Sequence, residues 1–344
     1  GIIVKQKRIA ILGTGANGSC AAADLTDAGF NVKLIDQWPE HVEAMRSNGL
    51  KITMPDRVLE VNVDAYNLCD VATFTEKFDI VLLFMKAYDT RWACELIKPY
   101  LEDDGILVGV QNCMTAEPIA EIMGSNRTIA CVAELSSELF VPGEIKRNTP
   151  PEGTWFALGP LDSNMNNRIP EIQEIMQHVG KVAISENILS AKWMKLIVNA
   201  MSMGLKAMVG KNNADTFKIN GMRDLMLKAG EEALLVGDGL GYKLEPIMGL
   251  TIEEMESSNR VQELLLDTIT RHVGPTAKNT VLQDHTKGRY SEVDDINGLI
   301  SRGGSKLGIS TPINDMIVEI TKKIHLGELK PSEDIAEIAK NFHK

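Results

Sequence analysis

The sequence lacks the features that define several large classes of protein. Only five of its 344 residues are cysteines, an odd number without a C-x-x-C pair, so we expect reduced thiols in a cytoplasmic protein and no metal centre. Its apolar runs, such as 80–85, are far too short to cross a bilayer, and no signal peptide is expected before the first apolar segment. The formal net charge is −11 and basic residues are scattered, which argues against a nucleic-acid surface. We therefore expect a small-molecule partner, with neither nucleic acid nor membrane.

The chain does contain a regular change from one pattern of elements to another. Its length and an apolar fraction of 44% predict a sizeable core divided between two domains. Strand and helix signals alternate over residues 1–187, whereas strand signals nearly vanish over residues 188–344. In the first part we expect strands at 8–12, 31–36, 79–84, 105–110, 127–133 and near 182, helices at 20–28, 39–47, 90–101 and 166–178, and turns with antiparallel strands at 141–159. In the second we expect helices at 190–205, 222–240, 252–273 and 312–326.

A glycine-rich loop follows the first expected strand directly. It runs Gly13-Thr14-Gly15-Ala16-Asn17-Gly18, a G-x-G-x-x-G pattern that opens a helix. In a dinucleotide-binding loop the first glycine permits the tight turn, the second lets the backbone approach a pyrophosphate, and the third allows close packing of helix on strand. The free N–H groups at the helix start then face the phosphates. The sequence therefore predicts an α/β fold: an N-terminal Rossmann-type doubly wound parallel sheet that binds a dinucleotide, followed by an all-α domain.

Asp36 ends the second expected strand and bears on which dinucleotide is bound. An acid at this place accepts hydrogen bonds from the ribose hydroxyls and repels a 2′-phosphate. The next residue, Gln37, offers no positive charge for that phosphate. We therefore expect NAD as the cofactor, with NADP less favoured. The alternative is that Asp36 only caps the helix start at Trp38 and Pro39.

Lys195 and Asn199 lie four residues apart on an expected helix that is apolar on nearly every side. The i, i+4 spacing places both side chains on one face. Burial disfavours the charged form of a lysine, which suits Lys195 to donate a proton to a carbonyl that is being reduced. The alternative is a lysine whose stem is buried while its ammonium reaches the surface.

Three further segments carry polar side chains. The loops 85–87 and 111–114 follow expected strands, so Lys86 and Asn112 belong to the sheet edge at which open α/β sheets bind ligands. Either residue could equally be a cap or turn residue. The acidic stretch 290–298 has the composition of a solvated turn or a helix start.

Taken together, these segments resemble the ketopantoate reductase (2-dehydropantoate 2-reductase) family over nearly the whole chain. The Gly13–Gly18 loop is similar to the family's nucleotide loop, and 193–199 is similar to the helix that carries its proton donor, which falls on Lys195. The stretch 291–298 resembles its T/S-E-I-D-x-I-N-G signature, in which the glutamate falls on Glu292. The resemblance implies that a hydride passes between the nicotinamide and a 2-keto carbon. Lys195 would donate the proton, and Glu292 would orient the substrate hydroxyl or the lysine.

The same resemblance assigns the remaining site residues. Lys86, Asn112 and Glu292 would contact the cofactor in addition to the loop, Asp36 and Gln37. Lys86, Asn112, Lys195, Asn199, Asn213 and Thr280 would bind the substrate. The family also implies a monomer or a homodimer, with the helical domain as the contact between subunits.

Four positions depart from the family pattern. Met203 stands where the lysine helix usually has another asparagine, Cys113 replaces the glycine of the H/Q-N-G turn, and Thr280 replaces a serine that would contact the substrate carboxylate. Gln37 stands where NADP-using members often have arginine. These departures predict an NAD-linked relative that acts on a bulkier or more apolar 2-keto or 2-hydroxy substrate.

Two other interpretations compete with this one. A β-hydroxyacid or 6-phosphogluconate-type dehydrogenase also has a Lys-x-x-x-Asn pair on the first helix of an α domain. However, the glycine-rich approach to that lysine is missing here, and the motif at 291–298 has no counterpart there. The second alternative is a protein that binds NAD without turnover. The presence of Lys195, Asn199 and Glu292 together argues against it.

Overall fold

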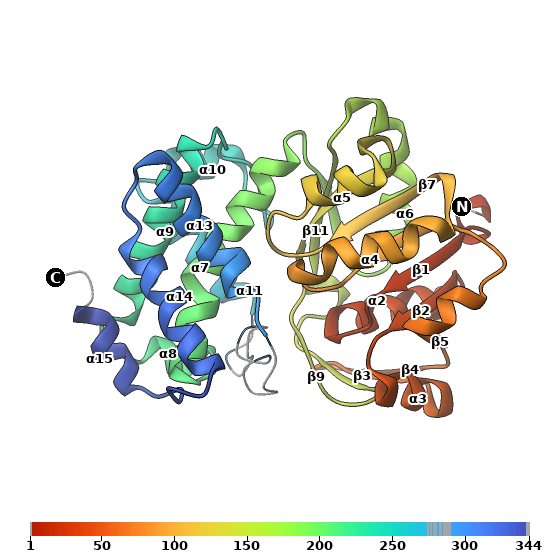
Figure 1. The fold of residues 1–344 in the computed structure, drawn as a ribbon, viewed down its shortest axis with the longest axis horizontal. Helices are drawn as coiled ribbons and strands as arrows, with labels where there is room; N and C mark the ends of the chain where they lie inside the picture. The colour runs from red at the N-terminus through yellow and green to blue at the C-terminus, as the bar shows by residue number, and fades with distance from the viewer. Residues whose placement is uncertain are drawn as a thin grey trace. The chain divides into compact units, whose positions relative to one another are not determined.

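The computed structural model describes residues 2–273 and 290–341, together with Pro275, Ala277, Val281 and Asp284. The chain divides into two compact units, Gly1–Ile188 and Leu189–Lys344 (Figure 1). The first unit contains both sheets, and the described residues of the second unit are helical or irregular.

The first unit is built on an eight-stranded sheet. In spatial order its strands are β12 (Lys181–Ile184), β11 (Trp155–Pro160), β8 (Thr128–Glu134), β7 (Leu101–Val110), β6 (Phe78–Leu83), β1 (Arg8–Leu12), β2 (Asn31–Asp36) and β5 (Asp64–Asn67). Every neighbouring pair is parallel except β8 and β11, which are antiparallel. The chain leaves β1 first toward β2 and later returns on the other side of β1 with β6, so the strand order reverses beside the glycine-rich loop. The predicted doubly wound sheet is therefore confirmed, with one antiparallel pairing.

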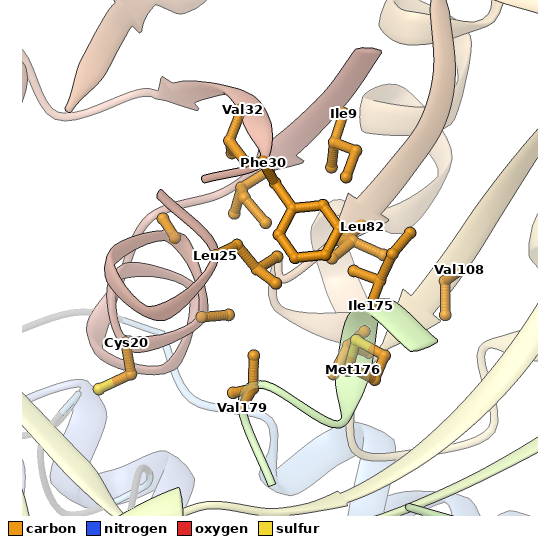
Figure 2. Close-up of a cluster of buried hydrophobic side chains, with 14 of the residues drawn as sticks. Ile9, Cys20, Leu25, Phe30, Val32, Leu82, Val108, Ile175, Met176 and Val179 are labelled. Carbon is orange, nitrogen blue, oxygen red and sulfur yellow. The ribbon is translucent and has the colours of Figure 1, made fainter. Parts of the chain in front are cut away.

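Helices cover both faces of this sheet. The helices α2 (Ala16–Asp27) and α6 (Ile169–Met176) pack on one face, and α4 (Thr90–Ile97) and α5 (Ala116–Met123) pack on the other. Alternate residues of each central strand enter different cores: Ile9 and Ile11 face α2, whereas Ala10 and Leu12 face α4. Figure 2 shows the first of these cores, with Leu25 and Phe30 beside Ile175 and Met176. Burial on both faces explains why the central strands read as continuous apolar runs.

The sequence did not reveal a second, four-stranded sheet in the first unit. Its order is β4 (Val58–Val61), β3 (Leu50–Thr53), β10 (Glu144–Arg147) and β9 (Ser137–Val141). All four strands contact α2. A buried ion pair joins the two parts, since Arg147 Nη1 lies 2.6 Å from Asp24 Oδ2 of α2. The expected antiparallel strands after 141 are thus divided between the two sheets.

Several predicted helices of the first unit have different ends. The helix α3 (Pro39–Asn48) agrees closely with the prediction, and a short helix α1 (Ile2–Lys5) precedes β1. The predicted helix 90–101 ends at Ile97 and continues as a 3₁₀ turn, Lys98–Tyr100. The predicted helix 166–178 begins as a 3₁₀ turn, Ser163–Arg168, before α6.

The second unit is a set of helices, and no strand occurs among its described residues. They are α7 (Ile188–Val209, which starts at the unit boundary), α8 (Asn213–Phe217), α9 (Met222–Gly239), α10 (Ile252–Ser257), α11 (Val261–His272), α13 (Val293–Leu307), α14 (Pro312–His325) and α15 (Asp334–Asn341). The single helix predicted over 252–273 is wrong, because the chain becomes extended at Ser258 and divides it into α10 and α11. The acidic stretch at 290–298 is the start of α13.

Candidate functional site

The glycine-rich loop lies between β1 and α2, at the carboxyl edge of the large sheet. Gly13 has φ +96°, and its N–H donates to the Ile35 carbonyl at 2.8 Å. A Cβ on Gly18 would collide with the Gly13 carbonyl oxygen, so the turn itself requires both glycines. A Cβ on Gly15 would meet no atom within 4 Å. Of these three glycines, Gly15 is therefore the one that borders open space, where a ligand could approach the backbone.

The start of α2 has the properties of an anion-binding helix end. Gly15 is the N-cap residue and no side chain caps the first turn, which also contains no acidic residue. The first backbone N–H groups of a helix have no partner within the helix. Together with the helix dipole, they favour a phosphate at this end. The loop thus fits the pyrophosphate of a dinucleotide.

Asp36 holds the loop in place from the end of β2. Its carboxylate accepts the Thr14 N–H at 2.8 Å through Oδ1 and the Trp38 N–H at 3.0 Å through Oδ2. Because each carboxylate oxygen has two lone pairs, one remains on each oxygen for a ribose hydroxyl. Asp36 therefore contacts Trp38, the residue before α3, but among the described residues no side chain caps that helix, and Asp36 also binds the loop. Gln37 beside it is exposed.

The loops after β6 and β7 are tied together by Gln111, which the sequence did not single out. Its Nε2 donates to the Met85 carbonyl at 2.8 Å and to Thr90 Oγ1 at 2.9 Å. These bonds fix the two loops that contain Lys86 and Asn112, both of which are half-buried.

Cys113 has a backbone conformation that favours glycine. It is buried and has φ +74°, in the left-handed region that favours glycine. A glycine, which the family pattern has at this position, would adopt such a backbone without steric cost. The cysteine adds a buried, weakly polar side chain at this point of the loop.

In the second unit, α7 brings Lys195 and Asn199 together. Lys195 Nζ donates to Asn199 Oδ1 at 3.2 Å, and the two residues are 5% and 1% exposed. This burial does not fit a lysine whose ammonium reaches the surface. The other side of the amide, Asn199 Nδ2, is buried and makes no hydrogen bond within the described part of the chain. A buried donor without a partner is costly, so Asn199 Nδ2 is a candidate for binding a ligand oxygen.

The other predicted residues of the second unit lie on different helices. Glu292 is buried at the N-terminal end of α13, and Asn213 is buried at the start of α8. Burial and the nearby charge of Glu292 raise the pKa of Asp295 in the first turn of α13. Thr280 lies outside the described residues. The structure thus brings Lys195 and Asn199 into contact and places Glu292 and Asn213 in buried positions of the same unit.

Asn297 of the acidic motif makes buried hydrogen bonds between helices that could not be predicted from the sequence. Its Nδ2 donates to the Ala200 carbonyl of α7 at 3.1 Å and to Asn314 Oδ1 at 2.9 Å. Asn314 in turn donates to the Ala229 carbonyl at 3.1 Å and to Glu232 Oε1 at 2.9 Å. This network joins four helices next to Asn199. It therefore fixes the turn of α7 that presents the Lys195–Asn199 pair.

We expect Asn297→Ala to lower the free energy of unfolding by about 1–3 kcal/mol, because it leaves the Ala200 carbonyl and Asn314 without this partner in a buried place. Urea unfolding followed by circular dichroism would measure the change. Ser305→Ala on the exposed face of the same helix is the matched control and should be neutral. An unfolding midpoint equal to that of the wild type would contradict the structural role of Asn297.

Comparison with protein families gives two matches that together cover most of the chain. The model described as "Ketopantoate reductase PanE/ApbA" matches residues 9–160. The model described as "Ketopantoate reductase PanE/ApbA C terminal" matches residues 187–325. Relatives from Lactococcus lactis and Pyrococcus horikoshii are both named 2-dehydropantoate 2-reductase. The first is 27% identical over 91% of this chain and 96% of its own length, and the second is 28% identical over 92% and 96%.

Solved structures of similar fold cover 93% of the chain. A ketopantoate reductase of this family from Ralstonia eutropha superposes with a TM-score of 0.77 at 26% identity, over 99% of its own chain. A D-mandelate dehydrogenase, solved with NADH and anilino(oxo)acetate, superposes with a TM-score of 0.82 at 23% identity, also over 99% of its chain. Both likenesses extend through the sheet unit and the helical unit.

The described residues were also compared with the requirements of a metal site and of a membrane-spanning helix. Among them, no group of three or more His, Cys, Asp or Glu side chains is arranged to hold a metal ion. Within the same part of the chain, no helix combines the length and apolar character needed to cross a membrane.

Proposed function

Because the chain belongs to the ketopantoate reductase PanE/ApbA family, we propose that it transfers a hydride between NAD(H) and a 2-keto or 2-hydroxy acid, with Lys195 as general acid and base. The observation that carries this proposal is the buried Lys195–Asn199 pair, in which the Asn199 amide still has a donor to offer. In this proposal the first unit binds the dinucleotide and the second unit, from residue 188 on, supplies the substrate and proton-transfer groups.

The residues of the first unit fit a dinucleotide. The loop Gly13-Thr14-Gly15-Ala16-Asn17-Gly18 and the uncapped start of α2 would hold the pyrophosphate. The Asp36 carboxylate would accept hydrogen bonds from the ribose hydroxyls. Lys86 and Asn112 follow β6 and β7 at the same sheet edge, and would face the nicotinamide end and the substrate. A bound nicotinamide would supply or accept the hydride.

The second unit would supply the proton. As the carbonyl carbon gains a hydride, its oxygen gains negative charge, and the Lys195 ammonium would give it a proton. A buried cation placed beforehand at that oxygen also stabilises the developing charge. Asn199 would hold the ammonium through Oδ1 and the substrate oxygen through Nδ2. Asn213 and Thr280 would bind the remainder of the substrate, and Glu292 would orient the substrate hydroxyl or the lysine.

Two parts of the proposal concern specificity. The buried carboxylate of Asp36 and the uncharged Gln37 favour NAD over NADP. Met203 and Cys113 stand where the family pattern has asparagine and glycine, so the substrate would be bulkier or more apolar than ketopantoate. Both positions are part of described segments, and Met203 is half-buried on α7.

Steady-state kinetics would test the proposal directly. The assay would pair ketopantoate, a longer aliphatic 2-keto acid and an aromatic 2-keto acid with NADH and with NADPH, together with the corresponding 2-hydroxy acids in the reverse direction. We expect the highest kcat/KM with NADH and one of the two more apolar acids. A high kcat/KM for ketopantoate with NADPH would contradict both specificity proposals while supporting the reductase itself. Absence of turnover with every pair would favour an NAD-binding protein without catalysis.

The family match decides against the β-hydroxyacid or 6-phosphogluconate-type alternative. The cytoplasmic location and a homodimer through the helical unit remain proposals from composition and family resemblance. Three exposed leucines suit a homodimer contact. Leu235 lies on α9, Leu240 directly follows that helix, and Leu307 lies on α13.

A further inference from the structure

We propose that His41 and Ser19 are positioning residues for the dinucleotide, which set the orientation of the Thr14–Gly15 peptide without touching the cofactor. The inference rests on the proposed cofactor site. It names two residues outside the G-x-G-x-x-G pattern that would determine how well the loop binds a pyrophosphate.

The proposal starts from a chain of three hydrogen bonds in the core of the first unit. The Gly143 N–H, from the turn between β9 and β10, donates to His41 Nδ1 at 2.9 Å. His41 Nε2 lies 3.2 Å from Ser19 Oγ, and Ser19 Oγ donates to the Thr14 carbonyl at 2.8 Å. The side chains of His41 and Ser19 are fully buried.

The chemistry of these groups fixes the direction of every bond in the chain. A backbone N–H only donates, so His41 Nδ1 must be the unprotonated acceptor nitrogen. The neutral imidazole then has its proton on Nε2 and donates it to Ser19 Oγ. Since the serine hydroxyl receives that proton as an acceptor, its own proton is directed to the Thr14 carbonyl. The chain therefore runs from the second sheet to the nucleotide loop.

The last bond of the chain determines which way a loop peptide faces. The described residues contain no cis peptide bond, and in a trans peptide the C=O and the next N–H point in opposite directions. The Thr14 carbonyl is held toward Ser19, so the Gly15 N–H is directed away from Ser19. The preceding N–H, of Thr14, is held by Asp36. Two consecutive peptides are thus fixed before any anion is bound.

The second sheet reinforces this arrangement at two further points. Ser137 Oγ of β9 donates to Asn17 Oδ1 in the loop at 2.5 Å, and Arg147 of β10 pairs with Asp24 of α2. The sheet β4-β3-β10-β9 therefore acts as a support for the start of α2. His41 connects this support to the loop carbonyl through Ser19. Its loss would remove the donor that directs the Ser19 proton to that carbonyl, without removing a charge.

The test compares three single variants and one double variant by their dissociation constants for NADH, measured by calorimetry. Ser19→Ala and His41→Leu should each raise the dissociation constant about tenfold, the effect of losing one buried hydrogen bond. His41→Gln should lose less, because an amide also offers one acceptor and one donor. The double variant Ser19→Ala/His41→Leu should bind no more weakly than the weaker single variant, since His41 acts through Ser19. At saturating NADH, kcat should stay near the wild-type value.

A matched control is Thr128→Val, which removes a buried hydroxyl bonded to the Gly124 carbonyl far along the sheet from the loop. It should leave the NADH dissociation constant unchanged. Dissociation constants of folded Ser19→Ala and His41→Leu within twofold of the wild type would overturn the proposal. Independent effects that multiply in the double variant would overturn the route through Ser19.

A measurement on the protein alone separates this inference from the proposed function. Nitrogen-15 NMR of the histidine ring should show His41 with its proton on Nε2, and hydrogen exchange at the Thr14 and Gly15 amides should accelerate in Ser19→Ala. An Nδ1-protonated ring or unchanged exchange would overturn the inference even where NADH binds. Failure of the wild-type protein to bind NADH or NADPH would instead contradict the proposed function. In that case the protonation state of the His41 ring and the exchange rates of the Thr14 and Gly15 amides would still decide whether His41 and Ser19 position the loop.

Discussion

Replacing Lys195 by alanine should lower kcat by about 10²–10⁴-fold, the usual contribution of a positioned proton donor, while the dissociation constant of NADH stays within about twofold of the wild type. The physical reason is that the ammonium is needed only when charge develops on the substrate oxygen. Stopped-flow measurement of NADH consumption would give kcat, and calorimetry would give the dissociation constant. Lys195→Arg should also remain slow, because a guanidinium retains the charge but does not give up a proton.

The matched control is Lys206→Ala on the same helix. Lys206 is also a buried lysine of α7, but it lies about two helical turns beyond Asn199, and its Nζ lies 5.5 Å from the centre of the Phe217 ring. Its loss should reduce stability and leave kcat of the folded enzyme near the wild-type value. Turnover by Lys195→Ala equal to that of the wild type would remove the assignment of Lys195 as the proton donor. Equal losses of kcat in both variants would point to a general effect on α7.

The large sheet could be predicted because its signals are local. Strands such as β6, at residues 80–83, are buried on both faces and read as continuous apolar runs, and a glycine loop between strand and helix has a fixed spacing. The Lys195–Asn199 contact was predictable for the same reason, since residues four apart on a helix are neighbours. Each of these features depends on fewer than about twenty consecutive residues.

The second sheet could not be predicted because its pairing is not local. In it β3 lies parallel to β10, with Lys51 opposite Glu144, and each of these two strands has only four residues. Such short segments carry little periodic signal of their own, and their burial depends on α2 from another part of the chain. For the same reason the sequence did not connect His41 with Ser19, or Asn297 with Ala200.

The family resemblance predicted more of the candidate site than the residue patterns alone could. The composition of an acidic stretch such as 290–298 does not by itself predict a functional site. In the structure this stretch leads into α13, and Glu292 at the start of that helix is buried. The resemblance also named the positions where this chain departs from the pattern. Of these, Cys113 has a left-handed backbone, which a glycine adopts without steric cost.

Removing the charge of Asp36 should change the choice of cofactor. A carboxylate about 4 Å from a 2′-phosphate charge, at an effective dielectric constant of about 20, is repelled by about 4 kcal/mol before screening by salt. Even after strong screening we expect the wild-type kcat/KM with NADH to exceed that with NADPH by about 100-fold, which corresponds to about 2.7 kcal/mol. The double variant Asp36→Asn/Gln37→Arg should bring the two values within about tenfold, because it removes the repulsion and adds a guanidinium that pairs with phosphate.

The contacts of Asp36 decide how this experiment must be designed. Asparagine at this position still accepts the Thr14 N–H through Oδ1, but its amide nitrogen would face the Trp38 N–H, so part of the loop's support is lost. A fall in NADH affinity without a gain for NADPH would therefore report damage to the loop and not a charge effect. The single variants separate the two causes. Gln37 is exposed, so Gln37→Arg should raise kcat/KM for NADPH without altering stability, whereas Gln37→Met, similar in size but uncharged, should leave the NADH to NADPH ratio unchanged. A wild-type preference for NADPH would show that the Asp36 carboxylate serves the loop alone and that the 2′-phosphate lies beyond its reach.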